Sequence, residues 1–72
     1  MSSVEVNGAE IQRIREERHL ERKELAELVG ISAFRVYAIE RRENSTRYST
    51  LRKIAMALGV SPESLHREKT TA

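Results

Sequence analysis

The chain has no cysteine and no tryptophan, and aromatic residues make up only 4% of its 72 residues. Without cysteine, neither a disulfide framework nor a thiolate metal site can form. No stretch approaches the roughly 18 consecutive apolar residues of a membrane-spanning helix, and the first ten residues lack the basic and apolar regions of a signal peptide. We therefore expect one soluble, cytoplasmic domain over residues 1–72, with its core at 8–66 and a polar tail at 67–72.

The sequence also lacks the residue spacings that are typical of enzymes and metal sites. The two histidines, His19 and His66, stand far apart in the sequence and match no metal-ligand spacing. There is no glycine-rich phosphate loop, and no nucleophile is paired with a base in a recognisable spacing. We expect no enzymatic activity, no metal ion, no cofactor and no small-molecule ligand.

Aspartate is absent, so glutamate carries all the acidic side-chain charge, and the net charge is only +2. The distribution of charge is more informative than its total. Residues 22–52 hold seven Lys or Arg against four Glu, a balance of +3. Basic charge concentrated in this way is expected of a surface that binds phosphate groups. An ordinary solvated helical surface explains it equally well, and charge alone leaves both interpretations open.

Apolar periodicity predicts five short helices with almost no linker between them. Their expected positions are about 8–18, 22–29, 33–41, 48–58 and a short helix from residue 62. Asn7 with Glu10 resembles a capping box, and Ser32 is a good N-cap for the third helix. Residues 42–46 are expected to form a polar connection, because no alternating strand pattern is present. The sequence therefore predicts an all-α fold.

The segment RKELAELVGISAFRVYAIER, residues 22–41, has the pattern of two helices joined by a tight turn. Its apolar positions are Leu25, Val29, Ile31, Val36 and Ile39. Ala26 is small where two helices would cross closely, and Gly30 falls at the turn, where a positive φ is often needed. This pattern predicts a helix-turn-helix, whose second helix lies in the major groove of DNA.

Besides residues 22–41, several short sequence motifs occur along nearly the whole chain, from Ile11 to Leu65. They are IREER at 14–18, ELAELVGIS at 24–32, IER at 39–41 and LRKIAMALGVS at 51–61. In this order and spacing the chain resembles the lambda-repressor-like helix-turn-helix family, the Cro and cI type of phage repressors and small bacterial regulators. The resemblance implies a compact five-helix domain, with the helix-turn-helix at helices two and three, that binds double-stranded DNA.

The resemblance also implies a structural ion pair. In the family, an arginine of the first helix pairs with the glutamate that follows the apolar pair of the third helix, and these positions are Arg15 and Glu40 here. A carboxylate close to the DNA-facing helix would repel phosphate unless it were neutralised. A paired and partly buried role is therefore expected for these two residues.

Helical geometry separates the residues of the third helix into an inner and an outer side. At about 100° per residue, Val36 and Ile39 define the inner side. The residues expected to contact bases are Ala33, Phe34, Arg35, Tyr37 and Ala38. Phe34 and Tyr37 suit contact with thymine methyl groups, and Arg35 suits guanine or a phosphate. Core packing or a protein interface remains an alternative for the two aromatic residues.

Phosphate contacts are expected at the start of the second helix and in the connection after the third. The expected residues are Arg22, Arg41, Arg42, Asn44, Ser45 and Arg47. The family usually has a Ser or Thr cap and a Gln where this chain has Glu21 and Arg22. It also has Gly and Pro where this chain has Arg42 and Thr46, so the connection departs from the family pattern at two positions.

A domain of this size buries little DNA surface, so a homodimer on a palindromic operator is expected. We expect the contact between the two subunits at Val60, Leu65 and His66, which resemble the usual dimerisation patch of the family. Repression is the regulatory role that the resemblance favours. The alternative is a protein-interaction module of the same fold, of the antitoxin or co-regulator type, in which DNA binding is secondary.

Overall fold

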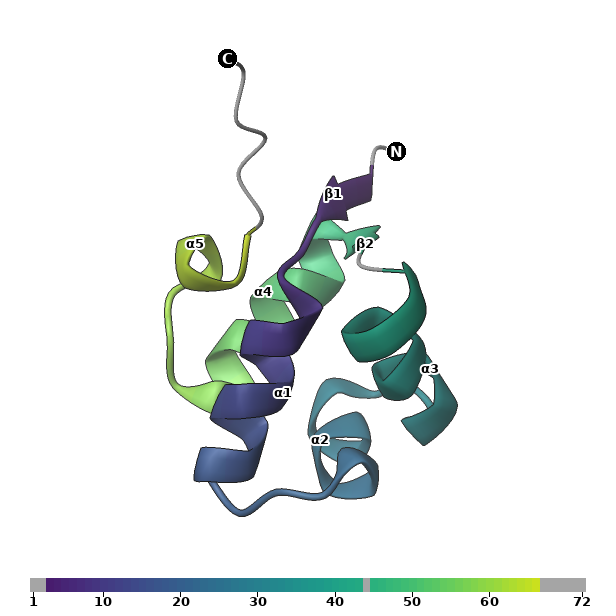
Figure 1. Cartoon of the computed structure of the whole chain (residues 1–72), viewed down its shortest axis with the longest axis vertical. Coiled ribbons are helices and arrows are strands. Elements are labelled where there is room, and N and C mark those ends of the chain that lie inside the picture. The colour runs from purple at the N-terminus through teal and green to yellow at the C-terminus, as the bar shows by residue number, and fades with distance from the viewer. Residues whose placement is uncertain (1–2, 44, 67–72) are drawn as a thin grey trace.

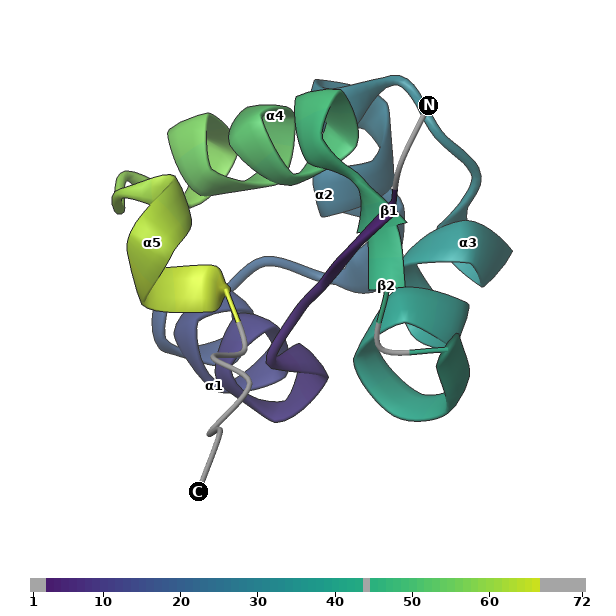
Figure 2. The same cartoon turned by 90° about the horizontal axis from the view of Figure 1, so that it is seen from above.

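The computed structural model describes residues 3–43 and 45–66. Its elements are, in order, β1 (Ser3–Glu5), α1 (Gly8–Glu17), α2 (Arg22–Val29), α3 (Ala33–Ala38), the π-helix η1 (Ile39–Glu43), β2 (Ser45–Arg47), α4 (Tyr48–Leu58) and α5 (Pro62–Leu65). The mostly helical fold with five α-helices confirms the sequence prediction (Figure 1). In Figure 2, α1 and α4 lie on opposite sides of the molecule, with α5 at one end and α3 at the other.

Local signals at the helix ends explain where the helices begin and stop. The side chains of Asn7 and Ser32 accept hydrogen bonds from backbone N–H groups of the first turns of α1 and α3, at 3.1 and 3.0 Å. Gly30 and Gly59 end α2 and α4 with φ of 87° and 75°, a conformation that glycine adopts without steric cost. His19 follows α1 with φ of 58°, which is strained for a residue with a Cβ.

Two short strands were not predicted from the sequence. β1 and β2 pair antiparallel, with Val4 opposite Thr46, and Thr46 is buried. The expected polar connection at 42–46 is therefore wrong, because its first residues belong to η1 and its last to β2. Each strand has only three residues, too few to produce an alternating pattern.

Apolar side chains from every helix, and from Val6 just after β1, meet in one core. Its members are Val6, Ile11, Ile14, Leu25, Ala26, Val29, Val36, Ile39, Leu51, Ile54, Ala55, Leu58 and Leu65. Leu65 was expected at a dimer contact, but its exposed fraction is 0%. The four-residue helix α5 turns this leucine inward, so it cannot contact a second copy. Of the expected patch, Val60 is half-buried and His66 is exposed.

Candidate nucleic-acid interface

The helix-turn-helix is formed by α2, a tight turn and α3. The N–H groups of Gly30 and Ile31 both donate to the carbonyl oxygen of Ala26, at 2.8 and 3.0 Å, and close the end of α2. Ala26 itself is buried between the packed helices, where a larger side chain would separate them. After the turn, α3 packs against α2 with Val36 in the core, while Phe34 and Tyr37 on its outer face stay exposed.

The outer face of α3 carries the two aromatic residues that were expected there. Phe34 is 67% exposed and Tyr37 is 37% exposed, which excludes core packing for this pair. Their ring centroids lie 6.2 Å apart with planes tilted by 37°. Ala33 is exposed and Arg35 is half-buried beside them. This face therefore presents an aromatic surface, with the small residue Ala33 at the N-terminal end of α3.

Ala38 does not belong to this exposed surface, because its exposed fraction is only 4%. The helical angle placed Ala38 on the side opposite Val36 and Ile39, but the residue is buried in the fold. Ala38 lies where α3 passes into η1, and a methyl group is too short to extend beyond its neighbours there. Its expected role in base contact is therefore wrong.

The expected ion pair between α1 and η1 is present. The Nε and Nη2 atoms of Arg15 donate to the two carboxylate oxygens of Glu40, at 2.7 and 3.2 Å, and Nη1 donates to the Leu20 carbonyl at 2.7 Å. The Glu40 side chain is 0% exposed and that of Arg15 is 7% exposed. This geometry satisfies a carboxylate that would otherwise be buried without compensation.

A second arginine joins this pair, and sequence reasoning missed it. Arg22 Nε donates to Glu40 Oε1 at 3.0 Å, so two guanidinium groups surround one carboxylate and the cluster carries a net positive charge. The Arg22 side chain is 34% exposed, and its Cζ lies over the Tyr37 ring, 5.1 Å from the centroid. Such a placement is a cation–π contact. The expected phosphate residue Arg22 is therefore already engaged by two side chains.

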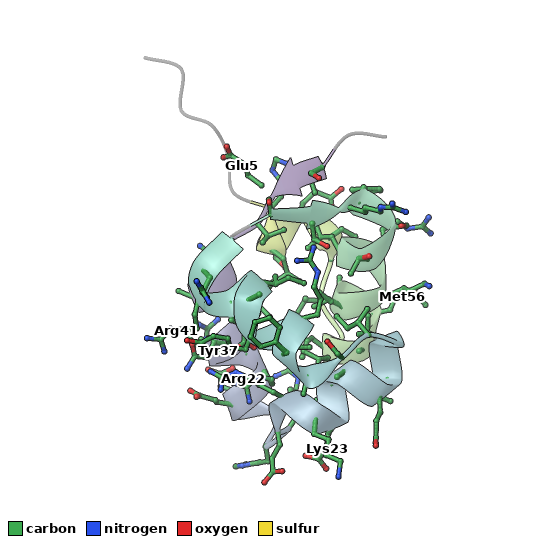
Figure 3. All side chains as sticks on the ribbon, turned by 90° about the vertical axis from the view of Figure 1, so that its right-hand side faces the viewer. Glu5, Arg22, Lys23, Tyr37, Arg41 and Met56 are labelled. Carbon is green, nitrogen blue, oxygen red and sulfur yellow. The ribbon has the colours of Figure 1, made fainter. Side chains whose placement is uncertain are left out.

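The remaining arginines of the expected phosphate cluster lie on η1 and β2. Arg41, Arg42 and Arg47 are exposed, and Ser45 is half-buried. Within residues 3–43 and 45–66, none of these three arginines forms an ion pair. Figure 3 shows Arg41 close to Tyr37 and Arg22, and Met56 at the opposite edge of this view. Asn44, which was expected in the same cluster, lies outside the described residues.

Two other features, a metal-binding cluster and a membrane-spanning helix, are not found in the described part of the chain. Residues 3–43 and 45–66 contain no group of three His, Cys, Asp or Glu side chains placed to hold a metal ion. No helix among them has the length and apolar character needed to cross a membrane.

Comparisons with known proteins agree with this architecture. The helix-turn-helix family matches residues 11–65. None of the curated protein sequences compared with the chain matches it. The N-terminal DNA-binding domain of SinR from Bacillus subtilis is similar in structure, with a TM-score of 0.78 and 31% identity over 89% of this chain and 94% of that one.

Two further solved structures are similar. SinR in complex with DNA has a TM-score of 0.75 and 29% identity, covering 79% of this chain and 92% of that one. The clp gene regulator ClgR from Corynebacterium glutamicum has a TM-score of 0.74 and 28% identity, covering 79% of this chain. The present chain spans 61% of that ClgR chain and 56% of the SinR chain solved in complex with SinI. By its matched residues and its fold, the chain belongs to the Cro/cI-type helix-turn-helix family of DNA-binding proteins.

Proposed function

We propose that this protein is a transcriptional regulator that binds double-stranded DNA sequence-specifically, with α3 in the major groove. The observation that carries the proposal is the exposed aromatic face of α3, together with exposed arginines on η1 and β2 that form no ion pair within the described residues. Base edges are read by side chains that enter a groove, and phosphates are bound by basic side chains at its rim. SinR, a similar protein, has been solved in complex with DNA.

In this proposal Ala33, Phe34, Arg35 and Tyr37 contact the bases. The small side chain of Ala33 permits close approach of α3, and Phe34 supplies apolar contact to thymine methyl groups. The hydroxyl of Tyr37 adds a hydrogen-bonding group next to this apolar surface. With so few polar side chains on α3, DNA shape contributes a large share of the specificity.

Phosphate contacts are proposed for Arg41, Arg42 and Arg47, with Ser45 as a neutral hydrogen-bonding partner. Each arginine that neutralises a phosphate releases condensed counterions and adds roughly one unit to the salt dependence of binding. Replacing Arg47 by Gln should therefore lower affinity for all duplexes alike and leave the preferred sequence unchanged.

We propose that the protein acts as a homodimer on a palindromic operator and that it represses transcription in the cytoplasm. Because Leu65 is buried, we place the dimer contact at a different surface, between α2 and α4. The apolar residues Leu28, Met56 and Ala57 line a hollow there together with Lys53, and Leu28 and Met56 are largely exposed.

Charge supports a second copy of this chain as the occupant of that hollow. Glu27 on α2 and Lys53 on α4 are exposed, and neither forms an ion pair within the described residues. A twofold axis through the apolar centre can bring the glutamate of one copy opposite the lysine of the other. Sedimentation velocity tests this arrangement with Met56→Glu and the matched variant Val60→Glu. Only Met56→Glu should yield monomer, and dissociation by Val60→Glu alone would move the contact to the connection between α4 and α5.

A second candidate function is a protein-interaction module, favoured by the exposed Phe34 ring, which also suits an apolar protein partner. SinR has been solved in a complex with the SinI protein. The salt dependence of binding to duplex DNA distinguishes the two functions. Affinity that falls steeply between about 50 and 200 mM salt supports DNA binding, and affinity that stays constant refutes it.

A further inference from the structure

Arg22 links the buried interior to the exposed face of α3. Its guanidinium Nε donates to the fully buried carboxylate of Glu40 at 3.0 Å. The same guanidinium lies over the Tyr37 ring, with Cζ 5.1 Å from the ring centroid. Glu40 is itself held by two hydrogen bonds from Arg15. A chain of contacts thus runs from the core to the aromatic surface, and Figure 3 shows Arg22 and Tyr37 next to each other at its outer end.

We propose that Arg22 is a positioning residue for base readout, which holds the Tyr37 ring in a fixed orientation on the outer face of α3. The inference rests on the proposed DNA-binding function and assigns Arg22 a different task from the phosphate contact that the sequence suggests. A ring held on one side by a guanidinium, and in contact with Phe34 at 6.2 Å on the same helix, loses little freedom when DNA binds. Preorganisation of this kind lowers the entropic cost of recognition.

The contacts of Arg22 favour this task over phosphate binding. A guanidinium that turned outward to a phosphate would leave Glu40 with one donor fewer in a fully buried position, which is unfavourable. It would also leave the face of Tyr37. The three exposed arginines Arg41, Arg42 and Arg47 form no ion pair or cation–π contact within the described residues, so binding a phosphate would not require them to break one. Arg22 is therefore better suited to orienting Tyr37.

The test compares Arg22→Gln and Arg22→Lys with Lys23→Gln, a matched control. Lys23 is the neighbouring exposed cation of α2 and forms no ion pair within the described residues. For each variant, affinities for a selected operator and for random duplex are measured at several salt concentrations. Circular dichroism checks that each variant folds. Arg22→Lys keeps a cation near Glu40, so it still tests the proposal if Arg22→Gln unfolds.

Both Arg22 variants should reduce the ratio of operator to random-duplex affinity, on the order of fivefold to tenfold. Lys23→Gln should leave that ratio unchanged. In a Tyr37→Ala background, Arg22→Lys should cause no further loss of selectivity. The proposal is overturned if Arg22→Gln weakens binding to all duplexes equally, reduces the salt slope by about one unit, and is rescued by Arg22→Lys.

A measurement without DNA separates this inference from the proposed function. If the wild type shows no selectivity for any duplex, the proposed function fails, whatever Arg22 does. Side-chain coupling constants from nuclear magnetic resonance then still report the Tyr37 rotamer, with the exposed Tyr48 as internal control. Arg22→Lys and Arg22→Gln should cause rotamer averaging at Tyr37 alone, and an unchanged Tyr37 would overturn its positioning by Arg22.

Discussion

Replacing Arg15 by Met should destabilise the protein severely. Arg15 supplies two of the three hydrogen bonds that reach Glu40 from side chains, and the Glu40 side chain is fully buried. Removing one partner of a buried ion pair costs about 3–5 kcal/mol because the other charge is left uncompensated. Since Arg22 still donates to Glu40, we expect a loss near the lower end, about 3 kcal/mol.

A loss of this size is a large part of the total stability, which for a chain of this length is about 4–11 kcal/mol. Urea unfolding followed by far-ultraviolet circular dichroism measures it. With a slope of about 1 kcal/mol per molar urea, the midpoint should fall by about 3 M. The control is the double variant Arg15→Met with Glu40→Met, which removes both charges and should recover at least about 2 kcal/mol. A loss below about 1 kcal/mol in the single variant, or no recovery in the double variant, refutes the reasoning.

Three other predictions concern the core, the turns and the response to acid. Leu65→Ala should lower the free energy of unfolding by about 2–5 kcal/mol, because Leu65 is fully buried, and leave the mass of the folded protein in sedimentation unchanged. Residues 19 and 30 both have positive φ, so glycine is favoured at each of them. His19→Gly should therefore raise the free energy of unfolding by up to about 1 kcal/mol, and Gly30→Ala should lower it by about 1–2 kcal/mol. Changes of the opposite sign in urea unfolding would contradict this. Hydrogen bonds from Arg13 hold the pKa of Glu10 below its ordinary value, so the pair stabilises the fold above the unfolded-state pKa, and this contribution is lost as pH falls through the folded pKa. Glu10→Gln should accordingly flatten the acid side of the stability–pH curve, and an unaltered acid side would argue against it.

The parts of the fold that sequence reasoning predicted depend on interactions between near neighbours. Asn7 and Ser32 cap helices within three residues of themselves, and Gly30 and Gly59 end helices through their own backbone conformation. Such signals are visible in any short stretch of sequence. The Arg15–Glu40 pair, which joins distant residues, came only from the family resemblance, because nothing local indicates it.

The parts that were missed depend on contacts between distant residues or on very short elements. The strand pair joins residues 3–5 to 45–47, and Arg22 reaches Glu40 across 18 positions of the chain. Leu65 lies in a helix of four residues, too short for periodicity to show which way it faces. For Ala38, the helical angle indicated a side of α3, but it could not show that neighbouring residues bury the alanine.

The central claim is that the outer face of α3 reads a specific sequence in double-stranded DNA. Selection of binding sites from random duplex, followed by titration of the selected and scrambled sites at about 50 and 200 mM salt, tests it most directly. We expect one enriched sequence, bound on the order of a thousandfold more tightly than the scrambled duplex, with affinity falling steeply as salt rises. Selection that enriches no sequence, together with affinity that is the same for both duplexes, would contradict the account.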